Sequence, residues 1–436
     1  MKKLSFVFDA IGPHGPCRNG EIPDIFDLVV SHMGTNETRN RLSGPVFHRI
    51  FMDENNIACD VYSSYNLPDH NFLYELSTLE CENFKSCFDN RIGFLSFHTN
   101  RYISENVFNS IKLKKGYYLI SNPFESFLED HILTSIHDYF NNLKIPLSRV
   151  IYVTCSPNAN EIYQSYCQRH NITPELKCEF MPIYASNLKQ ESSMGLTYEP
   201  GYRNKDFLCF NRRYRDHRLM FGLLLEKYNL LDRFYFSLSQ SQPENGRNFM
   251  SCINSVRHNI FSRFQITMDN ILELNDEIIN SFYSKLPLIL DTPDFDNLHT
   301  TKIDDKIRNL YNDSLVHIIS ETNFFTPIIH QTEKTIKPIS NLQPFIMLGS
   351  PDSLKSIKDM GFKTFDKFWD ESYDNEYDDN RRLIKIAELC KTISEWSSER
   401  KIEFTHEVKG IVDYNYNHFI NGRLVELDRW IEKYGN

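Results

Sequence analysis

The sequence predicts an α/β protein with two domains, each built on a parallel sheet that helices cover on both faces. Short apolar runs of strand length alternate with longer segments in which apolar residues recur at helical spacing. Strands that alternate with helices are typical of doubly wound α/β domains. With 436 residues, the chain is long enough for two such domains, each with its own core.

Five apolar runs predict strands in the N-terminal half, and two segments with helical periodicity accompany them. The predicted strands are residues 4–10, 57–62, 92–97, 117–121 and 150–155, and the predicted helices are residues 127–143 and 161–170. The polar stretch 184–202 has little periodicity and is a candidate linker. We therefore expect a first Rossmann-like domain over residues 1–190.

The C-terminal half continues the same alternation. Predicted strands are residues 206–210, 233–238, 287–291, 315–319 and 344–348; helical patterns cover 266–286, 383–393 and 417–434, and further helices begin near Leu219 and Thr332. These elements predict a second Rossmann-like domain over residues 200–410. Residues 411–436 are expected to form a C-terminal helix that returns toward the first domain, and the two domains are expected to face each other across a cleft.

Composition excludes several classes of protein. The formal net charge of −10 argues against a general binder of polyanions. No apolar run approaches the ~20 residues that a membrane-spanning helix needs, and the apolar run 4–10 is too short for a signal peptide. The ten cysteines are spaced singly, without a CxxC pair, so neither a disulfide framework nor a structural zinc site is expected. A reducing, cytoplasmic location follows as an expectation.

A cluster of cations follows the predicted strand 206–210. Arg212, Arg213, Arg215 and Arg218, with His217 among them, occupy the turn that leads into the next helix. The planar guanidinium group binds phosphate through two parallel hydrogen bonds, so the cluster is a candidate phosphate site. The alternative is a turn on the protein surface that is held by salt bridges.

A strand–helix–strand unit follows in residues 314–350. The strand 315–319 ends in Ser320, Glu321, Thr322 and Asn323; a helix begins at Thr332-Glu333-Lys334; and the strand 344–348 ends at Gly349. In open parallel sheets, ligands bind at the carboxyl ends of the strands. Backbone N–H groups at the helix start and Lys334 suit a diphosphate, and the Glu333 carboxylate suits ribose hydroxyls. The alternative is a Glu–Lys pair on a solvated helix face.

Polar residues also follow strands of the first domain. Asp9 and Glu125 each lie just past a predicted strand beside turn-forming residues, and either carboxylate could act as a general base on a hydroxyl. Each could equally be a turn residue or a helix cap. Asp294 and Asp296 match the DxD spacing of some metal-binding sugar transferases, but they lie in a turn-rich segment where such pairs are common. No metal is therefore predicted.

The motifs of the second half occur in a characteristic order. These motifs are KDFLCFNRRYRDHR with Arg218, IISETN with Glu321 and Asn323, TEK at Thr332-Glu333-Lys334, and PFIMLG ending at Gly349. In this order residues 200–365 resemble nucleotide-sugar glycosyltransferases of the two-Rossmann (GT-B) type, in particular the α-1,3-fucosyltransferase family and its phage and bacterial relatives. The strand-end triplet is Ser-Glu-Thr here, not Phe-Glu-Asn, and no counterpart of the family's N-terminal base motif is present.

The resemblance implies that Arg218 and Lys334 neutralise the donor diphosphate, that Glu333 binds the ribose and that Glu321 shapes the donor pocket. The expected activity is metal-independent transfer of a hexosyl, deoxyhexosyl or pentosyl group from a nucleoside-diphosphate sugar to an acceptor hydroxyl, without a cofactor. The acceptor would be a glycan or another hydroxyl compound. One alternative is a glycosyltransferase acting on a hydroxylated base in DNA, with Lys112, Lys114 and Lys115 and the arginine turn lining one groove. Another is a non-catalytic binding module of the same fold.

Overall fold

The computed structural model describes residues 2–8, 11–12, 15–16, 57–63, 67–77, 105–122, 126, 128–182, 184–185, 196–211, 215–238, 249, 253, 274–290, 305–422 and 425–436. Contacts divide the chain into two units. The first contains Met1–Ser186 and Arg423–Asn436, and the second contains Asn187–Gly422. The predicted strand 92–97 lies outside the described residues, as do Asp9, Glu125, Arg212, Arg213, Asp294 and Asp296.

The first unit contains a six-stranded parallel sheet. Its strands, in spatial order, are β4 (Asp60–Ser63), β1 (Ser5–Phe8), β5 (Leu73–Ser77), β6 (Tyr117–Asn122), β7 (Val150–Thr154) and β8 (Lys177–Phe180). A short antiparallel pair, β2 (Ile11–Gly12) and β3 (Gly15–Pro16), follows β1. The strands predicted at 4–10, 57–62, 117–121 and 150–155 are confirmed, whereas β5 and β8 lie outside the predicted strands. After β1 the chain adds β4 on one side of this strand and then β5 to β8 on its other side. The strand order therefore switches between β1 and β5.

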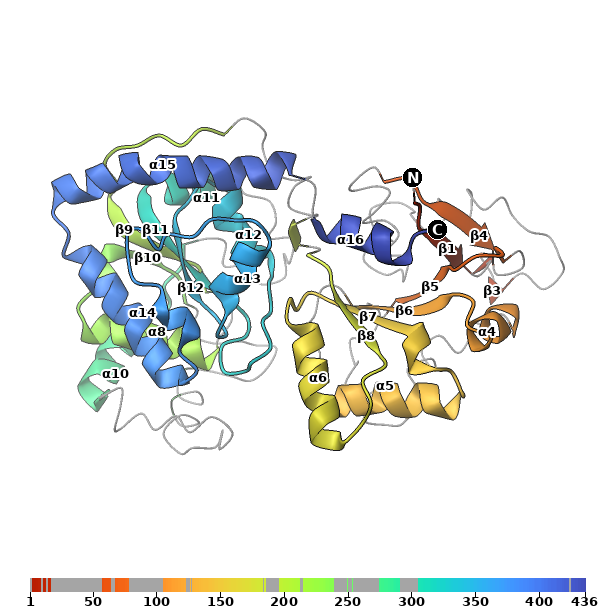
Figure 1. Ribbon diagram of the computed structural model, residues 1–436. Coiled ribbons are helices and arrows are strands. Elements are labelled where there is room, and N and C mark those ends of the chain that lie inside the picture. The colour runs from red at the N-terminus through yellow and green to blue at the C-terminus, as the bar shows by residue number, and fades with distance from the viewer. Residues whose placement is uncertain are drawn as a thin grey trace. The chain divides into compact units, whose positions relative to one another are not determined.

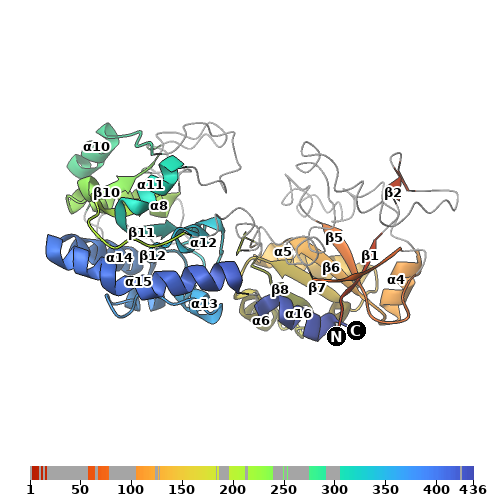
Figure 2. The same cartoon turned by 90° about the horizontal axis from the view of Figure 1, so that it is seen from above.

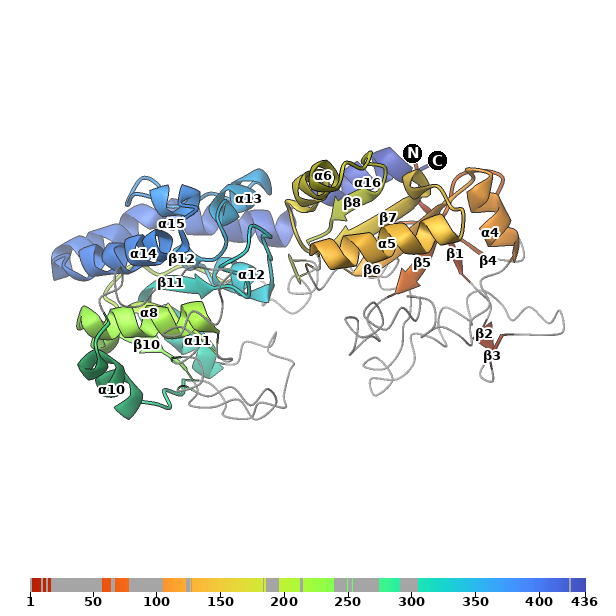
Figure 3. The same cartoon turned by 90° about the horizontal axis from the view of Figure 1, so that it is seen from below.

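Helices cover both faces of this sheet. The helices of the first unit are α4 (Glu105–Lys112), α5 (Asp130–Asn142), α6 (Ala159–His170) and α16 (Val425–Tyr434). Alternate residues of β6 point to opposite faces. Tyr118 packs against Phe140 of α5, with ring centroids 5.6 Å apart, whereas Tyr117 packs against Tyr434 of α16 at 5.5 Å. Accordingly, α16 lies on one face and α5 and α6 lie on the other (Figures 1 and 3).

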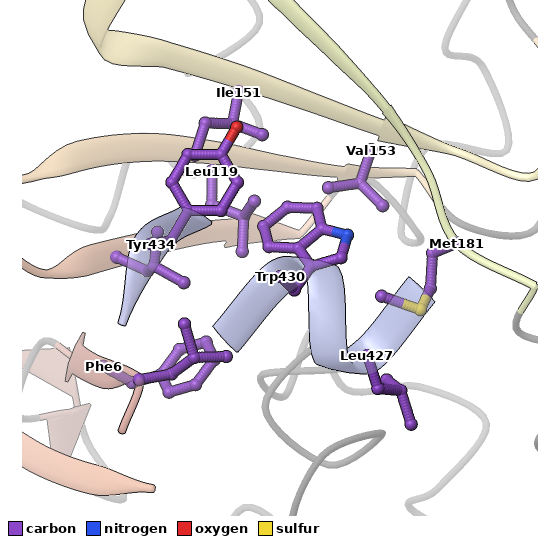
Figure 4. Close-up of a cluster of buried hydrophobic side chains, with 10 residues drawn as sticks. Phe6, Leu119, Ile151, Val153, Met181, Leu427, Trp430 and Tyr434 are labelled. Carbon is purple, nitrogen blue, oxygen red and sulfur yellow. The ribbon is translucent and has the colours of Figure 1, made fainter. Parts of the chain in front are cut away.

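The C-terminal helix belongs to the core of the first unit, as predicted. Leu427, Trp430 and Tyr434 are buried against the strands, together with Phe6 of β1 and Leu119 of β6 (Figure 4). The last residue also pairs with the start of the chain: the Asn436 N–H donates to the carbonyl of Lys3 at 2.9 Å, and the Lys3 N–H donates to the carbonyl of Asn436 at 3.2 Å.

The prediction of one helix over 417–434 is wrong. The long helix α15 (Ser398–Asn421) stops before Gly422, and α16 starts again at Val425. The boundary predicted at residue 411 therefore falls inside α15. The apolar positions Ile420, Leu424 and Leu427 keep helical spacing across the break, so periodicity concealed it; Gly422 was the stop signal.

The second unit contains a four-stranded parallel sheet in the order β10 (Phe234–Phe236), β9 (Lys205–Cys209), β11 (Ser314–Ser320) and β12 (Phe345–Leu348). These four strands confirm the predictions at 206–210, 233–238, 315–319 and 344–348. The strand predicted at 287–291 is wrong: Leu288 forms only an isolated antiparallel bridge with Leu238. Pro287 has no N–H to donate, which limits any ladder at this position.

Helices of the second unit also lie on both faces of its sheet. They are α8 (Asp216–Lys227), α10 (Asp276–Ser284), α11 (Asp305–Asn312), α12 (Glu333–Ser340), α13 (Ser353–Asp359), α14 (Asp379–Ser394) and α15. Helix α8 lies in the connection from β9 to β10, and α12 lies in the connection from β11 to β12. These connections lead in opposite directions across the sheet, so right-handed crossovers place the two helices on opposite faces. Consistent with this, α8 packs against α10 and α14, whereas α12 packs against α15 (Figure 2).

The predicted fold class is confirmed: both units are Rossmann-like α/β structures, and the last helix lies in the first unit. The cleft between the units stays a prediction. No helix among the described residues combines the length and apolar character needed to cross a membrane.

Replacing Trp430 with alanine should destabilise the first unit. Trp430 is 3% exposed within the core, and removing a large buried aromatic side chain costs about 3–5 kcal/mol. Amides of β6 and β7 should lose protection in hydrogen exchange, while those of β11 keep theirs. Glu432→Ala, at an exposed position of the same helix, is the matched control and should change little. Equal behaviour of the two variants would contradict the role given to α16.

Candidate functional site

The candidate site lies at the carboxyl ends of β9 and β11. These strands are neighbours in the sheet, and the chain leaves them in opposite directions toward β10 and β12. Such a point, where the strand order reverses, is the general ligand site of open α/β sheets. The arginine turn follows β9, and Glu321 follows β11, so the fold brings both predicted segments to this one edge.

The carboxylate of Glu321 connects the end of β11 to the start of α12. Its Oε1 accepts from the Thr332 N–H at 3.1 Å and the Thr335 hydroxyl at 2.6 Å. Its Oε2 accepts from the Thr332 hydroxyl at 2.8 Å and the Thr322 N–H at 3.1 Å. Glu321 is only 3% exposed. Four donors thus satisfy a buried carboxylate and fix the position of the helix start.

Helix α12 begins because Thr332 caps it. The Thr332 hydroxyl oxygen accepts from the N–H of Lys334 at 3.3 Å and from its ammonium group at 3.0 Å. Thr332 has extended backbone geometry, as an N-cap residue does. The remaining N–H groups of the first turn and the positive end of the helix dipole lie at the sheet edge where ligands bind.

Glu333 and Lys334 form an ion pair at this helix start. The Lys334 ammonium lies 3.1 Å from Glu333 Oε1, and the two side chains are 27% and 20% exposed, respectively. Burial opposes ionisation of Glu333, but the charges of Lys334 and Lys337 outweigh it and lower the pKa to about 2. Glu333 is therefore ionised near neutral pH, and both side chains remain partly accessible to a ligand.

Arg218 and His217 support this edge from the start of α8. Arg218 Nη2 donates to the carbonyls of Ser320 at 3.1 Å and Glu321 at 3.2 Å, and His217 Nε2 donates to the Glu321 carbonyl at 3.0 Å. Both side chains are buried. The start of α8 therefore contacts the end of β11. The Glu321 carboxylate, at that same strand end, holds the start of α12.

Burial and the neighbouring Arg215 lower the pKa of Arg218 to about 10, which still leaves it charged. Burial, Arg218 and Arg215 lower the pKa of His217 well below its ordinary value, so this ring is neutral near neutral pH. Arg215 itself precedes α8 as its N-cap residue, and its side chain is partly exposed. Of the two arginines that the structure describes in this turn, Arg215 is the more accessible to an anion.

A buried stack, which the sequence did not predict, holds the loop after β11. The ring of Phe324 lies parallel to that of His217, with centroids 5.3 Å apart and an interplanar angle of 10°. The guanidinium carbon of Arg382 lies 4.2 Å from the Phe324 ring centroid. Arg382 Nη2 donates to the Phe324 carbonyl at 2.6 Å, and Nε donates to the Gly349 carbonyl at 3.1 Å.

Arg382 thus joins the carboxyl ends of β11 and β12 from α14. It is 1% exposed, and burial lowers its pKa. The only sequence signal was a charged residue directly before Leu383, at the start of the apolar helical pattern. Nothing in the sequence identified the carbonyls of Gly349 and Phe324, which lie 33 and 58 positions earlier, as its partners.

The structure places seven of the predicted site residues in the second unit at this edge: Arg215, Arg218, Glu321, Asn323, Thr332, Glu333 and Lys334. Asn323 contacts its own loop, where its amide donates to the carbonyl of Ile328 at 3.3 Å. Arg212 and Arg213 lie outside the described residues, as do the candidate bases Asp9 and Glu125.

Among the residues that are described, no group of three or more His, Cys, Asp or Glu could hold a metal ion.

The likeness of this chain to known proteins is weak. No protein-family model matches the chain, and no curated protein matches it. Among solved structures the chain is similar to a trehalose-6-phosphate synthase, OtsA, with 10% identity over 90% of this chain and 82% of that chain, and a TM-score of 0.39. At this TM-score the likeness assigns neither fold nor activity to the chain. The resemblance to α-1,3-fucosyltransferases stays a prediction.

Removing the Glu321 carboxylate should loosen the start of α12. Glu321→Ala leaves two backbone N–H groups and two hydroxyls without their acceptor, which we expect to cost roughly 3 kcal/mol of unfolding free energy. Thr335→Val removes only one of these bonds with little change of shape and should cost about 1 kcal/mol. Denaturant unfolding and hydrogen exchange of α12 measure both. Similar losses in the two variants would contradict the central role of the carboxylate.

The Glu333 charge should stabilise the protein in a defined range of pH. Its folded-state pKa of about 2 lies below the ordinary value of 4.5, so the folded state binds the proton more weakly than the unfolded state does. The contribution is present above pH 4.5 and is lost as the pH falls toward 2. Wild type should therefore lose its stability advantage over Glu333→Gln across this range in urea unfolding. A constant difference would show that the carboxylate is not paired.

Proposed function

We propose that this chain transfers a sugar from a nucleoside-diphosphate sugar to an acceptor hydroxyl. One observation carries the proposal: an accessible Lys334–Glu333 pair begins a helix at a point where the strand order switches, and the buried Glu321 carboxylate fixes that helix start. Fixed cations and N–H groups at a helix start suit a diphosphate. A neighbouring ionised carboxylate suits the vicinal hydroxyls of ribose.

The proposed chemistry depends on charge that develops on the leaving diphosphate. When the bond between sugar and phosphate breaks, the phosphate oxygen gains negative charge, and the Lys334 ammonium and the first-turn N–H groups of α12 stabilise it. Arg215, which follows the neighbouring strand β9, provides a second cation at the same edge of the sheet. Because these groups are positioned before the reaction, the proposal includes no metal ion.

The buried residues Arg218, His217 and Glu321 hold other parts of the site in place. Arg218 and His217 hold the backbone carbonyls of Ser320 and Glu321, and Glu321 in turn holds Thr332. We therefore assign Arg218 a positioning role beneath the site, where it also contributes positive charge. Glu333, whose low pKa keeps it ionised, is proposed to accept hydrogen bonds from the ribose hydroxyls.

The first unit is proposed to bind the acceptor and to supply the general base. Its sheet has the same arrangement, with the strand order switching beside β1, and Asp9 immediately follows that strand in the sequence. Glu125 follows β6 three residues after its end. Asp9 or Glu125 is therefore the proposed base. No observation on the described residues favours a modified DNA base as the acceptor, and the proposal does not include one.

Lys334→Ala should reduce turnover about a hundredfold while the protein stays folded, since the loss of one cation from such a site costs about 3 kcal/mol of transition-state stabilisation. Release of nucleoside diphosphate from a panel of nucleotide sugars, with and without acceptors, measures this rate. Lys355→Ala on α13, at a side chain 66% exposed, is the control lysine and should retain full activity.

Wild-type turnover in the Lys334→Ala protein would exclude its role at the diphosphate. Absence of both turnover and thermal stabilisation by every nucleotide sugar of the panel would favour the non-catalytic module instead.

A further inference from the structure

The second unit contains a cavity at the opposite edge of its sheet, near the amino ends of the strands. Its volume is about 200 Å³, and its lining includes Arg203 before β9, Asn312 before β11 and Gln343 before β12. The complete lining is Leu196, Thr197, Tyr198, Glu199, Arg203, Arg308, Asn312, Asn341, Leu342 and Gln343. This cavity is separate from the candidate donor edge, because parallel strands place their two ends at opposite edges of the sheet.

Gln343 in this lining has a buried amide oxygen without a hydrogen-bond partner in the described part of the chain. Gln343 is 3% exposed, and its amide nitrogen donates to the carbonyl of Tyr311 at 2.6 Å, which fixes the orientation of the amide. The amide oxygen, Oε1, is buried and has no hydrogen-bond partner among the described residues. An acceptor left in this state costs about 1–3 kcal/mol, so a bound donor would relieve a definite penalty.

The lining presents donors and acceptors side by side on planar groups. Guanidinium, carboxylate and amide groups each offer two adjacent polar atoms, which match the spacing of vicinal hydroxyls. Six of the ten residues carry such a group: Glu199, Arg203, Arg308, Asn312, Asn341 and Gln343. Arg203 is itself held in place, since its guanidinium donates to the carbonyls of Glu199 at 2.5 Å and Tyr202 at 3.1 Å.

The electrostatics of the lining favour a neutral ligand over an anion. Helices α11 and α12 both end at this cavity, at Asn312 and next to Asn341, so the negative ends of two helix dipoles are directed toward it. The Glu199 carboxylate adds negative charge, which opposes the positive charge of Arg203 and Arg308. A hydroxyl group, which both donates and accepts, suits all of these partners.

We propose that this cavity binds a small polyhydroxylated molecule of monosaccharide size. The volume would hold about six or seven waters at ~30 Å³ each, which fits a single sugar ring, whereas drug-sized ligands occupy about 300–1,000 Å³. A nucleotide sugar is too large. Gln343 Oε1 accepts a hydroxyl hydrogen, and the guanidinium groups donate to hydroxyl oxygens. The site is distinct from the donor site of the proposed function and is independent of it.

Direct binding of neutral monosaccharides to the full-length protein tests the proposal. The probes are glucose, galactose, mannose and fucose, followed by saturation-transfer NMR and by calorimetry. Gln343→Met removes the acceptor at similar side-chain volume and should weaken binding about tenfold. Glu199→Leu changes an exposed side chain, so it keeps the test informative if Gln343→Met fails to fold, and it should also weaken binding. Asn309→Leu, exposed on α11 and outside the lining, is the control and should bind as wild type does.

Lys334→Ala should leave monosaccharide binding unchanged, which separates this site from the donor site. The proposal is overturned if none of the four sugars binds at millimolar concentrations, or if Gln343→Met and Glu199→Leu both bind as wild type does. It is also overturned if inorganic phosphate, used as an anionic probe, displaces the sugar at the same site and binds more tightly. Failure of nucleotide-sugar turnover would not affect these outcomes.

Discussion

The hydrogen bonds of the Glu321 carboxylate are the interaction on which the second unit's candidate site depends. A buried negative charge has a large desolvation cost, and only several donors at once can offset it. Here, two backbone N–H groups and two threonine hydroxyls do so. Because those donors belong to the strand end and to the first turn of the following helix, satisfying the charge also sets where the helix begins. This buried contact therefore also sets the position of the partly exposed Lys334–Glu333 pair.

Cations beneath the loop complete the arrangement. Arg218 and Arg382 are both buried, and both direct their guanidinium groups at backbone carbonyls at the strand ends. Phe324 contacts both the neutral ring of His217 and the guanidinium of Arg382. These contacts leave the loop after β11 little freedom, and they bring positive charge close to the edge where a diphosphate is proposed to bind. Arg218 and Arg382 therefore both hold the loop in place and add positive charge near the edge, without needing to contact a ligand.

The two units share the same strand order around their first strand. In each sheet the first strand lies between the second and the third, and all the strands are parallel. This order creates a switch point in each unit, and it places the candidate base Asp9 and the arginine turn after equivalent strands. The chain also passes between the units twice, since α16 returns to complete the core of the first unit. The first core is therefore complete only when the last residues of the chain are in place.

The sequence by itself determined the local part of this structure. Apolar periodicity located most strands and helices, and the strand–turn–helix order identified the Thr332–Lys334 corner and the arginine turn, because hydrophobic burial and helix capping act over a few residues. Only the tertiary structure decided the rest. Whether Arg218 is accessible or buried, which carbonyls Arg382 holds and which donors surround Glu321 depend on contacts between segments far apart in the sequence. Such contacts follow from packing, and a local pattern of residue types does not encode their partners.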